Sequence, residues 1–116
     1  MDNKIIYVAA IDVEGYADVS KIGETTFSKL GEEIRGIVDV KHGKARLLNF
    51  WMNRPYDVKE LRYTLVYTFG HDTCEEEEFK DWVVCPLESV KSAINYLDRK
   101  WEYREYRERR EKLLTI

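Results

Sequence analysis

The chain has 116 residues, of which 44% are hydrophobic and 13% aromatic, and its 22 acidic and 19 basic side chains give a formal net charge of −3. This composition excludes a disordered chain and predicts one domain that is large enough to bury a core. No apolar run approaches the ~20 residues of a membrane span, and the first residues do not read as a signal peptide. The two cysteines, Cys74 and Cys85, form no disulfide-scaffold pattern, so we expect a reducing, cytoplasmic setting without a membrane partner.

The N-terminal half of the chain predicts two pairs of strands. Residues 4–13 are apolar on both alternations, which is typical of a central strand covered on both faces. After a turn, residues 16–22 predict a returning strand. Residues 37–40 and 45–52 flank a short tetrapeptide in the manner of a hairpin.

A short helix is expected between these two pairs. Thr25 or Thr26 would cap its start, and Gly36 would end it. Its apolar face would carry Phe27, Leu30 and Ile34.

The strongest strand pattern of the chain lies in residues 61–69. Apolar and polar side chains alternate there, and the aromatic and β-branched types favour strands. We therefore predict a strand that ends before Gly70. After an acidic connector, residues 82–85 predict a further short strand.

One long helix is predicted for residues 88–115, which follow Pro86 and contain no glycine or proline, with Ser89 as the N-cap. At about 100° per residue, five apolar side chains fall on one stripe suited to a core. They are Val90, Ala93, Ile94, Leu97 and Trp101. Because charged residues replace this stripe beyond Trp101, we expect the distal part of the helix to project from the domain.

These elements together predict the fold class. The chain is expected to be a single α+β domain over residues 1–116. It would have a mostly antiparallel sheet of four to six strands, one short helix and the long C-terminal helix.

The side of the long helix opposite its apolar stripe carries tyrosine and arginine side chains. We call this side the Tyr/Arg face, and it consists of Tyr96, Arg99, Tyr103, Tyr106, Arg110 and Leu113. Tyr and Arg are enriched in the hot spots of protein interfaces, so this face is a candidate surface for a protein partner or for a homodimer. The alternative is an ordinary solvated face tied by i,i+4 ion pairs, each worth about 0.2–0.5 kcal/mol.

An acidic run offers a second candidate contact. It consists of Glu75, Glu76, Glu77 and Glu78. Such a run is commonly a solvated loop, and it also suits docking to a basic partner surface.

Charge is distributed unevenly along the chain. Residues 99–112 hold seven basic and four acidic side chains, a net of +3, which leaves −6 for the rest. Arginine interleaved with aromatic residues can bind nucleic acid, so this segment carries an alternative function as a nucleic-acid-binding site. The interleaved glutamates oppose phosphate contacts and make this the less favoured of the two functions.

Two groups of residues were weighed as metal sites. Asp12-Val13-Glu14 follows the first strand and resembles the first motif of the DEDD-type 3′–5′ exonucleases, which implies a metal-dependent nuclease. The further acidic and histidine motifs of that family are not found in this sequence. His71 and Cys74 have the spacing of a zinc-ligand pair, but His42 and Cys85 do not supply a second short-spaced pair.

The sequence therefore predicts no catalytic residues, no bound metal and no cofactor. We expect a small, non-catalytic protein-binding module, of the modulator or inhibitor type that phages and mobile elements direct at host proteins. Nucleic-acid binding is the first alternative, and a small metal-dependent, nuclease-like enzyme is the second.

Overall fold

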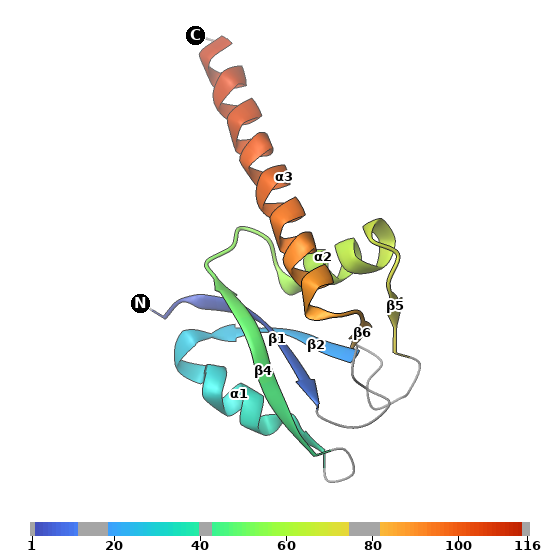
Figure 1. Ribbon diagram of the computed structural model, residues 1–116. Coiled ribbons are helices and arrows are strands. Elements are labelled where there is room, and N and C mark those ends of the chain that lie inside the picture. Colours follow the sequence, from blue (N-terminus) through green and yellow to red (C-terminus); the bar gives the residue numbers. More distant parts are fainter. Residues whose placement is uncertain (1, 12–18, 40–42, 75–81, 115–116) are drawn as a thin grey trace.

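The computed structural model describes residues 2–11, 19–39, 43–74 and 82–114 (Figure 1). Within these residues one antiparallel sheet has six strands in the order β3-β4-β1-β2-β6-β5. Together with the long C-terminal helix, this confirms the predicted α+β class. The elements are β1 (Lys4–Ile11), β2 (Val19–Thr26), η1 (Phe27–Lys29), α1 (Leu30–Gly36), β3 (Val38–Asp39), β4 (Gly43–Met52), α2 (Val58–Tyr63), η2 (Thr64–Thr68), β5 (Asp72–Thr73), β6 (Val83–Val84) and α3 (Leu87–Leu114).

Strand β1 is the centre of the sheet and is covered on both faces, as its apolar alternations predict. One face packs Ile5, Tyr7 and Ala9 against Leu30 of α1. The other face belongs to a larger core to which Leu61, Leu65 and the buried residues of α3 also contribute. The domain therefore has three layers, with α1 on one side of the sheet and α2, η2 and α3 on the other.

Strand β4 contains a β-bulge that explains which of its apolar side chains lie on each face of the sheet. Its register with β1 shifts by one residue so that Leu48 is extra, and the Asn49 side chain accepts a hydrogen bond from the Phe50 backbone N–H at 2.8 Å. A bulge resets the alternation of a strand. As a result Leu47 and Phe50 pack on the α1 side, whereas Leu48 and Trp51 pack on the α3 side.

Tyr7 occupies space that only a glycine leaves open. It lies opposite Gly23 in the β1–β2 pair. A Cβ atom at position 23 would lie 2.6 Å from Tyr7 Cε1 and closer still to Cζ and Oη. The Tyr7 hydroxyl donates to Glu33 Oε1 of α1 at 3.1 Å. The aromatic ring therefore ties β1, β2 and α1 together.

The predicted threonine cap of the short helix is correct in position only. Thr26 ends β2 and is the N-cap residue of η1, but its side chain makes no capping hydrogen bond. Asp2 supplies the acceptor instead, because the Ser28 backbone N–H donates to its Oδ1 at 3.0 Å and the Ser28 hydroxyl donates to its other oxygen. The helix ends at Gly36, as predicted.

Residues 61–69, predicted as the clearest strand, are helical, and that prediction is wrong. Helix α2 begins after Asp57, whose side chain accepts a hydrogen bond from the Glu60 backbone N–H at 2.9 Å. Leu61 and Leu65, four residues apart, are both fully buried in the larger core. The helical spacing of these two leucines and the cap outweigh the strand preference of the side chains between them.

The helix widens in its second half. The Phe69 backbone N–H donates to the Thr64 carbonyl at 3.0 Å, five residues back, which is the hydrogen bond of a π-helix. Tyr63 and Tyr67 lie on its outer side with their ring centroids 4.6 Å apart. Gly70, with φ of 77°, then lets the chain leave the helix.

Candidate protein-binding surface on the C-terminal helix

Helix α3 is anchored to the domain by the predicted stripe. Val90, Ala93, Ile94 and Leu97 are buried, and Trp101 packs half-buried against the same core. The helix begins at Leu87, one residue before the predicted start, and is described to Leu114, whereas the predicted last residue, Thr115, lies outside the described residues. Ser89 therefore lies inside the first turn, so its predicted role as N-cap is wrong.

Beyond Trp101 the helix leaves the body of the domain. Residues 102–114 are all exposed, and Figure 1 shows α3 extending well past the sheet and the other helices. The longest dimension of the molecule is 62 Å, against 35 and 21 Å in the other two directions. The distal half of α3 therefore extends away from the sheet and the other helices.

The Tyr/Arg face lies on one side of this helix. Its members from Tyr96 to Leu113 fall within about 100° of the helix circumference. Tyr103 and Tyr106 are 63% and 62% exposed, and Leu113 is 71% exposed. Large aromatic side chains with this exposure are available for contact with another molecule.

Beyond Tyr96 the carboxylates of the helix lie outside the arc of the Tyr/Arg face. Between Tyr96 and Leu114 the Tyr/Arg face contains no acidic residue, because the carboxylates project at other angles. Those carboxylates belong to Asp98, Glu102, Glu105, Glu108 and Glu111. Arg109 pairs with Glu105 at 2.7 Å, and Arg107 lies 4.0 Å from Glu111. Among the described residues Arg99 and Arg110 have no carboxylate partner, so the face itself keeps two uncompensated cations.

A shallow hollow lies at the base of the Tyr/Arg face. It is lined by Ser92, Asn95, Tyr96, Arg99, Lys100 and Tyr103. Phe69 at the end of η2 meets Tyr96 edge to face, with centroids 6.1 Å apart. The aromatic surface therefore continues from α3 onto the body of the domain.

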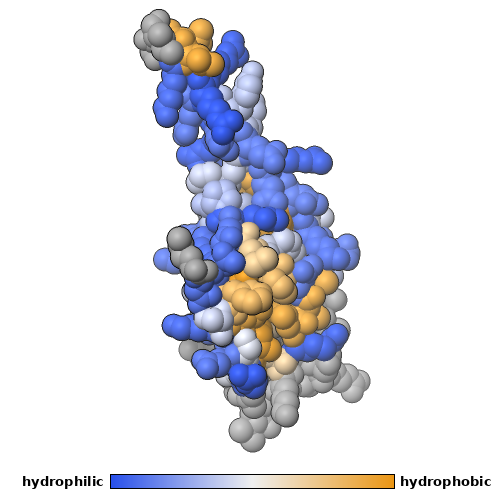
Figure 2. All heavy atoms as spheres, turned by 90° about the vertical axis from the view of Figure 1, so that its left-hand side faces the viewer, coloured by the Kyte–Doolittle hydropathy of each residue, from blue (hydrophilic) through white to orange (hydrophobic). Residues whose placement is uncertain are grey.

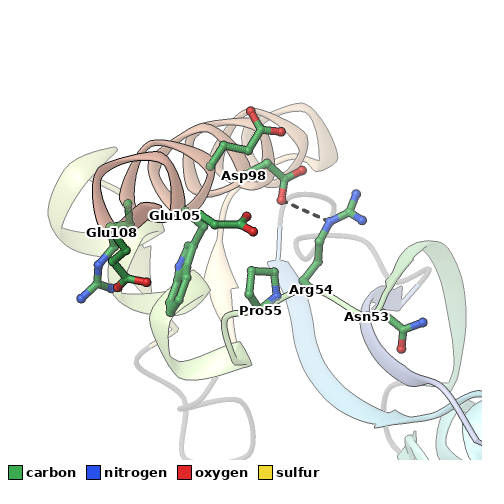
Figure 3. Close-up of a pocket in the computed structure, with 9 residues that line it drawn as sticks. Asn53, Arg54, Pro55, Asp98, Glu105 and Glu108 are labelled. Atoms are coloured by element: carbon green, nitrogen blue, oxygen red, sulfur yellow. Dashed lines mark ion pairs between the residues drawn. The ribbon is translucent and has the colours of Figure 1, made fainter. Parts of the chain in front are cut away.

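A second, larger hollow of about 840 Å³ lies between α3 and the segment that connects β4 to α2. Figure 3 shows Glu105 and Glu108 along the helix and Arg54 extending toward Asp98 from the connector. Arg54 Nε is 3.2 Å from Asp98 Oδ1, and the Tyr56 hydroxyl donates to the same oxygen at 2.6 Å. The pKa of Tyr56 is raised above its ordinary value. Burial of the side chain is the main cause, and the hydrogen bond to Asp98 is the second.

Across this hollow, the ion pair of Arg54 with Asp98 links α3 to the segment between β4 and α2. Among the described residues the lining of the hollow holds four carboxylates and two arginines, and no histidine, cysteine, serine or lysine. Arg104 lies over the Trp101 ring at 4.9 Å, and Trp101 Nε1 donates to Glu60 at 3.3 Å. The bond from Trp101 to Glu60 of α2 and the pair of Arg54 with Asp98 tie the helix to the body of the domain near the point where it leaves.

Of the residues weighed as metal ligands, only His71, Cys74 and Cys85 lie in the part of the chain that the structure describes. Asp12, Glu14 and His42 lie outside the described residues, as do Glu75, Glu76, Glu77 and Glu78 of the acidic run. His71 and Cys74 are half-buried, and Cys85 is buried. Within the described ranges no three His, Cys, Asp or Glu side chains gather as a metal site would require.

Sequence reasoning missed two features beside the helix. The exposed pair of Tyr63 and Tyr67 was assigned to a strand, although their spacing of four residues is that of neighbours on a helix. The ion pair of Arg54 with Asp98 is the second feature, and no sequence pattern links these two residues, which lie far apart along the chain.

No protein-family model, curated protein or solved structure matches the chain. In the described part of the chain no helix combines the length and the apolar character that crossing a membrane requires.

Proposed function

We propose that the protein is a non-catalytic protein-binding module whose projecting helix presents the Tyr/Arg face to a partner. The observation that carries this proposal is the exposure of Tyr103 and Tyr106 on a part of α3 that adds nothing to the core. Exposed tyrosines contribute little to the stability of the domain alone, whereas a partner that covers them gains large, rigid contact area. A module of this kind would act as a modulator or inhibitor by occupying a surface of its partner.

The charge of the face favours an acidic partner over a second copy. In a two-fold helix pair the same surface patch of both copies meets, so Arg99 and Arg110 of each copy would approach the equivalent cations of the other. Like charges across an interface are unfavourable, and a complementary acidic surface avoids that cost. The partner is therefore a different protein with carboxylates opposite these two arginines.

The same charges favour a protein over a nucleic acid. Nucleic-acid affinity depends on neutralising many phosphates, and binding falls steeply with salt for that reason. In segment 99–112, Arg107 and Arg109 already lie beside glutamates, and Lys100 is 4.0 Å from Glu60. Few cations remain uncommitted, which suits an interface led by tyrosines.

The test is capture of partners on immobilised protein, compared across matched variants. The binding variant is Tyr103→Ala with Tyr106→Ala, and the control is Glu105→Ala with Glu108→Ala, which changes the same helix on the side away from the Tyr/Arg face. We expect one protein to be enriched by the wild type and the control but lost with the tyrosine variant. Equal capture by all three would contradict the proposal.

A fluorescent single-stranded oligonucleotide tests the alternative in the same samples. We expect no binding at physiological salt. Binding that weakens steeply with salt and depends on Arg107 and Arg110 would replace the protein-binding proposal with the nucleic-acid one.

A further inference from the structure

A second candidate surface lies at an edge of the sheet, along the outer side of strand β4. Strand β4 pairs with β1 along one side, but on its other side β3 reaches only Gly43 and Lys44. No other described strand pairs with residues 45–52 there. An open strand edge presents unpaired N–H and C=O groups that can bind another strand.

Strand β2, on the other side of the sheet, is also only partly paired, but a helix side chain covers its backbone. Strand β2 pairs with β6 only at Val19 and Ser20. Past that point Arg62 of α2 donates a hydrogen bond to the Ile22 carbonyl, so a helix covers the backbone there.

Along the outer edge of β4 two backbone groups are already engaged by neighbouring side chains, because the Phe50 N–H donates to Asn49 Oδ1 at 2.8 Å and the Met52 carbonyl accepts from Arg54 at 3.4 Å. A second strand would have to exchange these two local bonds for bonds to its own backbone.

Apolar side chains gather beside the open edge. Figure 2 views the side of the molecule that carries α1 and β4, and apolar residues cluster there on the body below the projecting helix. Phe27, predicted to belong to the apolar face of the short helix, is 55% exposed, and Met52 is 43% exposed. Phe27 lies edge to face with the half-buried Phe50 of β4, with centroids 6.5 Å apart. Open backbone and apolar side chains thus coincide on this border.

The bulge makes the edge complementary to itself. In a two-fold, antiparallel pairing centred between Leu48 and Asn49, Leu47 faces the second copy's Phe50, and both belong to the α1 side. Arg46 and the second copy's Trp51 also face each other, and both belong to the α3 side. In this register the extra residue at Leu48 keeps the two side chains of each facing pair on one side of the joined sheet.

From the open edge, its self-complementary pattern and the adjoining apolar patch, we propose that β4 pairs with β4 of a second copy to form a reversible homodimer. At about 3.4 Å per residue and about 10 Å of sheet thickness, residues 45–52 form an edge of roughly 270 Å². Phe27 and Met52 enlarge the contact toward 400–500 Å² per copy, on the order of the smallest specific interfaces. This area suits a concentration-dependent dimer and falls short of an obligate one.

This dimer does not depend on the proposed function of α3. A two-fold axis perpendicular to the joined sheets keeps both α3 helices on one face and both α1 helices on the other. The Tyr/Arg faces stay uncovered, so the two surfaces can be tested separately.

The test is solution mass by light scattering or sedimentation over a wide range of protein concentration. We expect the mass of the wild type to rise from 13.8 kDa toward twice that value. Met52→Glu and Phe27→Glu place a charge on exposed positions and should each weaken association by about tenfold or more. Amide hydrogen exchange in residues 45–52 should slow as concentration rises, whereas exchange in residues 102–114 should not.

Control variants on α3 distinguish this dimer from a helix-mediated one. Tyr103→Ala with Tyr106→Ala should dimerise like the wild type. A wild type that stays at 13.8 kDa up to millimolar concentration would overturn the proposal. So would association that survives Met52→Glu and disappears in the tyrosine variant.

Discussion

The contact between Gly23 and Tyr7 allows a quantitative test of the core. Gly23→Ala adds one methyl group, whose carbon would lie 2.6 Å from Tyr7 Cε1. Carbon atoms normally stay about 3.5–4.0 Å apart, so the ring would have to move by an ångström or more. Tyr7 is fully buried and hydrogen-bonded to Glu33, and the strand pairing holds its backbone opposite position 23.

The expected cost follows from overpacking. Insertion of a methylene-sized group into a packed core commonly costs about 1–3 kcal/mol, and the rigid surroundings of Tyr7 place this variant near 3 kcal/mol. For a domain of this size that loss lowers the melting temperature by roughly 10 °C. Urea unfolding followed by circular dichroism would measure the free energy of unfolding directly.

Gly36→Ala is the matched control. Position 36 is the exposed last residue of α1, and no atom would lie within 4 Å of an added Cβ. There the same substitution should be neutral or stabilise by up to about 1 kcal/mol, because alanine reduces the freedom of the unfolded chain. If Gly23→Ala were as stable as Gly36→Ala, the account of Tyr7 as a fixed, tightly packed ring would be refuted.

Three further predictions concern the other layers of the fold. Leu97→Ala removes a fully buried side chain of α3 and should cost about 3 kcal/mol in urea unfolding, with a cost under 1 kcal/mol contradicting the placement of the stripe in the core. Asp57→Ala removes the cap of α2 and should cost about 1 kcal/mol, whereas Asp57→Ser should retain most of the stability, and equal losses would argue against capping. Because burial and the hydrogen bond to Asp98 raise the pKa of Tyr56 above 10.0, only the unfolded chain ionises this group just above that pH. The contribution of this group to stability is therefore complete below pH 10 and declines above it, and Tyr56→Phe should make the alkaline loss of stability shallower.

The elements that could be predicted from the sequence are those in which local preference and burial agree. The core stripe of α3 follows the helical period, and β1 is apolar on both alternations because helices cover both its faces. The strand prediction for residues 61–69 was wrong because aromatic and β-branched side chains alternate there, whereas the buried residues, Leu61 and Leu65, are spaced four apart as on a helix. The signal that could have corrected this prediction was Asp57 with Glu60 three residues later, which is a helix-start pattern.

The candidate surface was predictable only in part. The Tyr/Arg face follows from helical geometry, and its exposure agrees with the pattern. The same helical geometry places the glutamates outside that face, although basic and acidic residues are mixed along the sequence of segment 99–112. The open edge of β4 could not be predicted, since it depends on how short β3 is and on where α1 crosses the sheet.

The division of α3 into a packed half and a projecting half has a consequence for how the projecting half stays ordered. A short helix alone in water is marginal because its first turn must fix several residues for one hydrogen bond. Here the turns from Val90 to Leu97 are already fixed by the core, so the residues beyond Trp101 extend an existing nucleus and avoid that initial cost. Each added turn needs only the smaller propagation step, and fraying should start at Leu114 and proceed inward. A molecule that docks on the Tyr/Arg face therefore binds a helix whose first turns are already fixed by the core of the domain.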